Sequence, residues 1–262
     1  MLTEDQIHHF RVFGFLALRQ VFDTEEIERL GRLADEIWSG ELGHTPSEEE
    51  HVSMAPFLEL HASTAELIED DRLYTPMAQL LGKDMMWMGS EGVQGTMTRR
   101  PYHHWHADRP GPLELGYLRI KIMMYLDPMR KDAGAFRVIP GSHRSPLHEE
   151  LTPFQQRHGL EDPAFFGYTG SEVPCHAVET DPGDAVIFNQ SLYHAVYGKA
   201  GRRRYIALKY STRPTTDAHL ASIMQYSPDA LKPHERILRS ESPRLRALIN
   251  GIDELKTRAE AL

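Results

Sequence analysis

The chain has 262 residues, 40% hydrophobic and 26% charged, a composition typical of a globular protein with enough apolar side chains for a core. The formal net charge of −9 argues against a nucleic-acid-binding surface, and no dense run of Lys and Arg opposes that conclusion. The single cysteine, Cys175, excludes a disulfide or a thiolate metal cluster within one chain. Because no apolar stretch reaches membrane-spanning length and no signal pattern begins the chain, we expect a cytoplasmic protein without a membrane partner.

The first third of the chain is expected to be mostly helical. Thr3 and Gln6 form a capping-box pattern, and after Asp23 apolar residues recur at helical spacing. The predicted elements, in order, are a helix from residue 3 that Gly14 interrupts, a strand over 15–18, a helix over 23–38, a loop over 39–55 and a helix over 63–82.

From about residue 83 to 213, short apolar segments separated by Gly, Pro and Asp predict a sandwich or barrel of strands. The first of these segments are 85–88, 92–98, 103–108 and 117–126. In 117–126 apolar side chains alternate with Tyr117, Arg119 and Lys121, a period of two that predicts a half-buried strand. Its polar face meets either bulk water or a polar cavity inside a barrel. In a cavity, Arg119 and Lys121 could hold an anionic substrate.

Two segments of mixed polarity are candidate lids over an opening. They are the loop 39–55 and the excursion 146–172, which contains a predicted helix. From Pro214 the chain turns helical and charged, and residues 241–262 predict a surface helix. This tail could cover the barrel or form a dimer, so the oligomeric state stays open.

The segment 102–108, Tyr-His-His-Trp-His-Ala-Asp, contains the residues that predict chemistry. On a strand, alternate residues share a face, so the imidazole of His106 and the carboxylate of Asp108 would point the same way. A second histidine from elsewhere, for which His194 is the candidate, would complete a 2-His-1-carboxylate triad. This ligand set suits non-haem Fe(II) and leaves coordination positions open.

Neighbouring histidines offer alternatives. His104 and His106 have the same spacing, so a His-His pair without the carboxylate is also considered. By parity, His104 shares the face of His106 and could line the approach of a substrate, whereas His103 is expected on the opposite face. His143 follows a Pro-Gly turn, and we assign it a structural role.

The order of several motifs resembles the phytanoyl-CoA dioxygenase family of Fe(II)- and 2-oxoglutarate-dependent oxygenases. The similar stretches are 14–18 (Gly-Phe-Leu-Ala-Leu), 106–108 (His-Ala-Asp), 132–143 (Asp-Ala-Gly-Ala-Phe-Arg-Val-Ile-Pro-Gly-Ser-His), 182–184 (Pro-Gly-Asp), and His194 followed by Arg203. The resemblance implies a mainly β fold with flanking helices, a double-stranded β-helix (jelly roll, cupin-like). It further implies a single domain over 1–262, in which residues 1–82 are mostly helical, residues 83–213 form the jelly-roll core and residues 214–262 form a helical tail.

The resemblance also implies the cofactors and the reaction. His106, Asp108 and His194 would hold Fe(II), with 2-oxoglutarate and O2 in the remaining positions. Relatives that chlorinate carbon carry Ala or Gly in place of the carboxylate, so Asp108 implies hydroxylation or a related oxidation, with 2-oxoglutarate converted to succinate. Since no nucleotide-binding motif is present, the expected substrate is a small polar or anionic metabolite and not a CoA ester.

The distal carboxylate of 2-oxoglutarate requires a cation, and the planar fork of arginine suits it better than lysine. Strand alternation favours Arg203 facing the cavity, and the family spacing from this arginine to an aromatic residue is met by Tyr210. Arg204 stays open because the interval from His194 to Arg203 is shorter than expected for the family. Lys121 is a further candidate for 2-oxoglutarate.

Arg119, His104, Asn189 and Tyr193 are the candidates for contacts with substrate or for support of the metal ligands. Two other functions remain possible on this basis. One is a cupin-like metalloprotein with a 2-oxoglutarate-independent reaction, which would not require the arginine, and the other is a non-catalytic metal-binding module.

Overall fold

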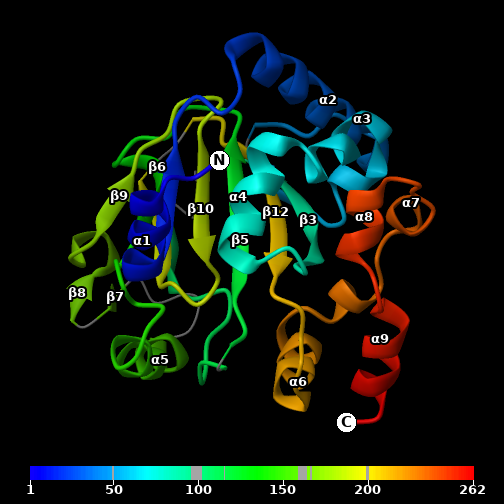
Figure 1. The fold of residues 1–262 in the computed structure, drawn as a ribbon. Coiled ribbons are helices and arrows are strands. Elements are labelled where there is room, and N and C mark those ends of the chain that lie inside the picture. The colour runs from blue at the N-terminus through cyan, green and yellow to red at the C-terminus, as the bar shows by residue number, and fades with distance from the viewer. Residues whose placement is uncertain (49, 96–101, 115, 159–163, 166, 199–200) are drawn as a thin grey trace.

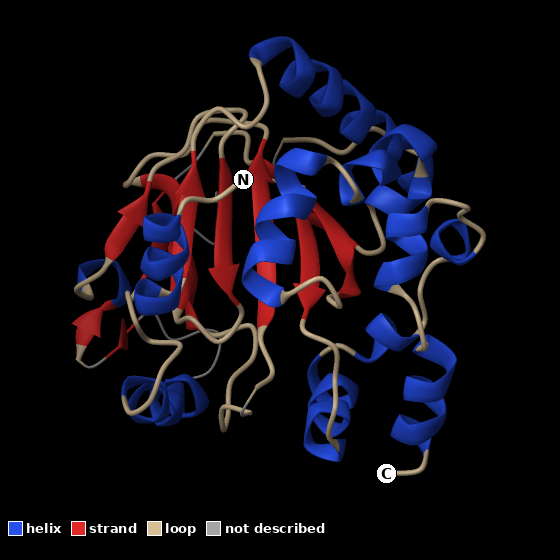
Figure 2. Ribbon diagram, viewed as in Figure 1, coloured by secondary structure: helices blue, strands red, loops and turns tan. Residues whose placement is uncertain are grey.

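The computed structural model describes residues 1–48, 50–95, 102–114, 116–158, 164–165, 167–198 and 201–262 (Figure 1). Two antiparallel sheets face each other, and helices cover the outer face of the larger one (Figure 2). This is the double-stranded β-helix expected from the sequence.

The larger sheet has the order β1-β10-β5-β12-β3-β2 and the smaller one the order β4-β11-β6-β9. The larger contains β1 (Phe15–Leu18), β2 (Val52–Met54), β3 (Met86–Gln94), β5 (Arg119–Tyr125), β10 (Ala185–Asn189) and β12 (Arg204–Ser211). The smaller contains β4 (Tyr102–His106), β6 (Ala133–Val138), β9 (His176–Val178) and β11 (His194–Gly198). A separate hairpin is formed by β7 (Ala164–Phe165) and β8 (Tyr168–Thr169).

Helices occupy the two ends of the chain and one excursion from the barrel. They are α1 (Glu4–Phe13), α2 (Thr24–Leu42), α3 (Ala62–Ala65), α4 (Asp71–Leu81), α5 (Leu147–His158), α6 (Asp217–Tyr226), α7 (Glu235–Leu238), α8 (Pro243–Leu248) and α9 (Ile252–Glu260). Short 3-10 helices are η1 (Leu58–Leu60), η2 (Glu66–Ile68), η3 (Gly170–Glu172) and η4 (Pro228–Leu231). None of the described helices is long and apolar enough to cross a membrane.

Several predicted boundaries were wrong because pairing and capping override local pattern. β3 is one strand where two were predicted, although residues 96–98 of the second prediction lie outside the described residues. Within the predicted loop 39–55, residues 52–54 pair with β3 as β2. The predicted helix 63–82 is divided at Asp70, whose side chain caps α4, and the predicted helix 241–262 is divided at Gly251.

β5 lies in the middle of the larger sheet and is buried on both faces, so it is not half-buried, and its polar face meets the barrel interior, one of the two environments that the sequence left open. Ile120, Ile122 and Met124 pack in the core cluster that includes residues of α1, α2 and α4. The opposite face, which carries Arg119 and Lys121, therefore points into the barrel. The alternation reflects two different interiors, one apolar and one polar.

The C-terminal tail packs against one end of the barrel. Residues of α6, η4 and α9 form a separate core cluster with Met86, Met88 and Tyr117. In Figure 1, α6 lies beyond the end of β12, which places it next to the start of the antiparallel neighbour β5. The tail thus covers this end of the barrel, which is one of the two arrangements that the sequence left open.

His143 lies next to α1, in agreement with a structural role. Its Nε2 atom is 3.3 Å from the backbone carbonyl of Arg11. The neighbouring N–H of Gly141 donates to the carbonyl of Phe13 at 2.9 Å. The Pro-Gly turn after β6 is therefore joined to the end of the first helix.

Gly183, in the turn before β10, is predicted to be sensitive to substitution. Its φ is +96°, and an added Cβ would lie 2.3 Å from the carbonyl oxygen of Phe22. We expect Gly183→Ala to lower the free energy of unfolding by about 3 kcal/mol, measured by urea denaturation. Gly201→Ala is the control, since a Cβ there meets nothing within 4 Å and should change stability by less than about 0.5 kcal/mol. Equal effects of the two substitutions would contradict this account.

Candidate metal centre

Pairing of β4 with β11 brings two histidines and an aspartate together. His106 and His194 are Cα partners across the two strands. The Oδ1 atom of Asp108 lies 3.6 Å from Nε2 of His106 and 3.5 Å from Nε2 of His194. Each of the three residues thus offers a ligand atom within 4.8 Å of the others, as required of groups that share one ion.

The local structure that places Asp108 differs from the predicted one. β4 ends at His106, and Asp108 follows in a bend, so the two residues do not share a strand face. The N–H of Arg109 donates to the carbonyl of Gln190 at 3.0 Å and holds the bend against the segment before His194. The three residues meet as predicted, but a tertiary hydrogen bond places the carboxylate.

Backbone carbonyls orient both imidazoles. Nδ1 of His106 is 2.7 Å from the carbonyl of His104, and Nδ1 of His194 is 2.8 Å from the carbonyl of Leu192. A proton on each Nδ1 donates to its carbonyl and leaves the Nε2 lone pair directed toward Asp108. Burial lowers the pKa of His194, which favours the neutral imidazole that a metal ligand requires. Two neutral imidazoles and one carboxylate are a donor set that fits Fe(II).

The other oxygen of Asp108 belongs to a buried chain of alternating charges. Its Oδ2 accepts from Nζ of Lys121 at 3.4 Å, Lys121 lies 2.9 Å from Glu91, and Glu91 lies 2.5 Å from Lys209. Burial alone would raise the pKa of Asp108, but the charge of Lys121 holds it well below its usual value. In the same way the two lysines overcome burial and lower the pKa of Glu91 to about 2.

This chain of charges was only partly anticipated. Lys209 shares strand parity with Arg203, which is a usable signal, but nothing in the sequence pointed to Glu91. Lys121, a candidate for 2-oxoglutarate, lies inside the barrel and contacts two carboxylates of the chain.

Aromatic rings surround the histidines. The ring centroids of Phe136 and Phe188 are each 5.0 Å from that of His194, so apolar side chains pack against this ligand. The ring of His103 stacks on His106 with centroids 4.3 Å apart, so its predicted location on the opposite face was wrong. The pairing between β4 and β11 has a bulge here, and this shift of register breaks the parity on which the prediction relied.

The neighbouring arginines Arg203 and Arg204 lie on opposite sides of the larger sheet. Arg203 is buried, with Cζ 4.8 Å from the ring of Tyr205 and 5.9 Å from the ring of Tyr125. Arg204 pairs with Asp127 at 2.8 Å and Asp35 at 3.1 Å, next to α2. Only Arg203 therefore extends toward the barrel interior.

The candidates for substrate contacts are separated by the structure. Tyr193 packs in a cluster with Trp105, and its hydroxyl donates to Thr152 at 3.2 Å. The side-chain oxygen of Asn189 accepts from the N–H of Ser191 at 2.8 Å and shapes the turn before His194. The carbonyl of His104 orients His106. Arg119, by contrast, lies buried at the end of the barrel near α6 and donates to Ser222.

A double-stranded β-helix with a His-Asp-His cluster defines the class of 2-His-1-carboxylate oxygenases. The chain belongs to the phytanoyl-CoA dioxygenase (PhyH) family, whose profile matches residues 10–203. The dioxygenase lolE1 from Epichloe uncinata is 26% identical over 212 residues, which cover 74% of this chain and 75% of that protein.

Solved structures share the fold. HygX from Streptomyces hygroscopicus, with nickel and 2-oxoglutarate bound, has a TM-score of 0.65 at 20% identity, covering 82% of this chain and 89% of HygX. SnoK, a non-haem 2-oxoglutarate-dependent carbocyclase from nogalamycin biosynthesis, has a TM-score of 0.60 at 18% identity, covering 80% and 84%. With the family established, the protein is an Fe(II)- and 2-oxoglutarate-dependent dioxygenase that uses O2, which confirms the class expected from sequence.

Asp108 is predicted to be indispensable for metal binding. Asp108→Ala removes one of three ligands, and we expect the affinity for Ni(II), measured by isothermal titration calorimetry, to fall by at least about 100-fold. The variant should still fold because Lys121 keeps its ion pair with Glu91. As a control, Asp84→Ala removes a carboxylate whose side chain is 76% exposed, and it should leave Ni(II) affinity unchanged. Retention of Ni(II) affinity in Asp108→Ala would contradict the assignment.

Proposed function

We propose that the enzyme hydroxylates a small polar or anionic metabolite other than a CoA ester, and that 2-oxoglutarate is decarboxylated to succinate. The observation that carries this proposal is the presence of Arg203 in the same barrel as the His-Asp-His cluster. Iron and 2-oxoglutarate supply the oxidation, in which one oxygen atom of O2 enters the substrate and the other enters succinate. The two alternatives, a 2-oxoglutarate-independent reaction and a non-catalytic module, are set aside because the chain belongs to the PhyH family.

Different residues bind the metal and 2-oxoglutarate. His106, Asp108 and His194 hold the metal through Nε2 and Oδ1 atoms. Arg203 binds the distal carboxylate of 2-oxoglutarate, in preference to Arg204, whose guanidinium is already paired with two carboxylates.

Tyr125 and Tyr205 flank that arginine, and burial raises the pKa of Tyr125 to about 12, so its hydroxyl keeps the proton and can donate to the carboxylate. We assign Lys121 to the orientation of Asp108 and not to 2-oxoglutarate, because its contacts are Asp108 and Glu91.

Three features support hydroxylation of a small molecule. The carboxylate of Asp108 takes the position that would otherwise be free for a halide. HygX, which shares the fold, has been crystallised with nickel, 2-oxoglutarate and hygromycin B bound, at a TM-score of 0.58 and 22% identity. Phe136 and Phe188 pack against the ring of His194 and exclude water from that side of the metal centre.

The three consecutive arginines provide a matched test. Arg203→Met should raise the Kd for 2-oxoglutarate by about 100-fold, because a buried charge-assisted pair is lost. Arg202→Met, which removes an exposed ion pair, should leave the Kd unchanged. Arg204→Met should lower stability by leaving Asp127 without its partner, again without an effect on 2-oxoglutarate.

The readout is an anaerobic visible spectrum of the Fe(II) protein titrated with 2-oxoglutarate. A weak charge-transfer band that requires both components, and that weakens only in Arg203→Met, is the expected result. A band of equal strength in all three variants would refute the role of Arg203. Fe(II) binding without any band in the unsubstituted protein would refute the use of 2-oxoglutarate at this site.

A further inference from the structure

Two buried arginines, Arg109 and Arg119, lie next to each other at the end of the barrel that α6 covers. Gln190 joins their backbones, since its carbonyl accepts from the N–H of Arg109 and its N–H donates to the carbonyl of Arg119, both at 3.0 Å. Arg109 directly follows the metal ligand Asp108. Arg119 precedes Lys121, the partner of Asp108, by two residues on β5. The pair therefore sits just outside the metal centre.

One aromatic ring of the C-terminal tail contacts both guanidinium groups. The ring centroid of Tyr226, the last residue of α6, is 5.7 Å from Cζ of Arg109 and 5.8 Å from Cζ of Arg119. The same helix supplies Ser222, whose hydroxyl accepts from Nη2 of Arg119. The ring of Tyr117 lies 5.0 Å from Arg119. Helix α6 thus packs against both guanidinium groups.

Several N–H groups of the two arginines lack acceptors. Arg109 is 4% exposed and Arg119 is 3% exposed. Within the described residues, Nε of Arg109 and both Nε and Nη1 of Arg119 are buried with no hydrogen-bond partner. Each buried donor left unpaired costs about 1–3 kcal/mol, so three of them on two neighbouring arginines indicate a ligand that carries acceptors.

Positive charges also outnumber negative charges around the two arginines. Arg109 pairs with Glu114, whose charge also acts on Arg119, and no carboxylate of the described residues lies within ion-pair distance of Arg119. Burial lowers the pKa of Arg119, although Tyr117 and the charge of Glu114 oppose this effect. Two guanidinium charges face one carboxylate, which leaves an excess of one positive charge. A carboxylate with a single negative charge balances it, whereas a phosphate, at about −1.5 to −2, would exceed it.

We propose that Arg109 and Arg119 bind a carboxylate group of the substrate, with the ring of Tyr226 against it, so that the rest of the molecule extends to the metal centre. The inference rests on the proposed function, because it names the class of substrate for the same site. Lys121 is two residues further along β5 than Arg119, so Arg119 lies about 7 Å from the level of Lys121 and Asp108. The substrate class is therefore a small carboxylic acid whose oxidised carbon lies a few bonds from the carboxylate.

The test uses Ni(II)-loaded protein saturated with 2-oxoglutarate, so that the site at Arg203 is filled. Benzoate and benzamide, which have similar shapes but differ in charge, are titrated by isothermal calorimetry. Benzoate should bind at least tenfold more tightly than benzamide, and Arg119→Gln and Arg109→Gln should each weaken benzoate binding at least tenfold. The variants should keep their affinity for 2-oxoglutarate.

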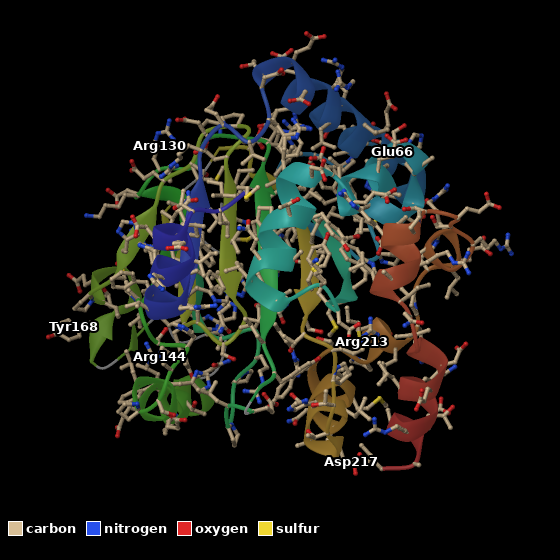
Figure 3. The ribbon with its side chains drawn as sticks, in the orientation of Figure 1. Glu66, Arg130, Arg144, Tyr168, Arg213 and Asp217 are labelled. Atoms are coloured by element: carbon tan, nitrogen blue, oxygen red, sulfur yellow. The ribbon has the colours of Figure 1, made fainter. Side chains whose placement is uncertain are left out.

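Arg130→Gln is the matched control, because Arg130 is an exposed arginine at the opposite end of the molecule from Asp217, where α6 begins (Figure 3). It should leave benzoate binding unchanged. Since both arginines are buried, circular dichroism checks the folding of Arg119→Gln and Arg109→Gln, and the preference of the unsubstituted protein for benzoate over benzamide gives the result if neither variant folds.

Equal binding of benzoate and benzamide, or benzoate binding that neither arginine variant affects, would overturn the proposal. Phenyl phosphate binding more tightly than benzoate would overturn the choice of a carboxylate. The Ni(II)-loaded protein is first titrated with 2-oxoglutarate to saturate it. Failure of 2-oxoglutarate to bind in that titration would instead refute the proposed function. The two failures are therefore read from separate titrations of the same sample.

Discussion

The burial of charge inside the barrel is the constraint that organises the site. A buried charge without a partner costs several kcal/mol, so buried lysines and carboxylates of a polar interior are stabilised when opposite charges alternate within contact distance. Asp108, Lys121, Glu91 and Lys209 satisfy this requirement as a chain from the metal centre to the wall of the barrel. Lys121 keeps one oxygen of Asp108 occupied, which leaves the other directed at the two imidazoles. The geometry of the metal ligands is therefore set before any metal arrives, by ion pairs that the fold itself needs.

The larger sheet separates two environments through alternate residues of the same strands. On β5, Ile120 and Ile122 face the helices while Arg119 and Lys121 face the interior. At the start of β12 the same alternation sends Arg204 to the carboxylates next to α2 and leaves the preceding Arg203 between two tyrosines inside the barrel. Sheet packing and site construction are thus one process, since a shift of one residue in register would exchange core and site.

The C-terminal tail belongs to the site as well as to the packing of the barrel. The family profile ends at residue 203, whereas α6 lies beyond it and brings Tyr226 and Ser222 against Arg119. The strands that carry His106 and His194 lie within the residues that the family profile matches. Helix α6, which packs against Arg109 and Arg119, lies outside them. This division explains how one scaffold can keep a common oxidation while the space that receives the substrate differs.

Local pattern was enough to predict a sandwich or barrel of strands and the candidate set His106, Asp108 and His194, because periodicity and motif spacing can be read along the chain. The double-stranded β-helix was implied by the resemblance to the phytanoyl-CoA dioxygenase family. Local pattern could also favour Arg203 over Arg204, since alternation on one strand is local too. It could not find Glu91 or Arg109, nor the stacking of His103 on His106. These features depend on a bulge, on a bend held by Gln190, and on the docking of a distant helix. They emerge only in the folded chain, because pairing between residues far apart in sequence depends on which buried charges and apolar faces find complementary partners.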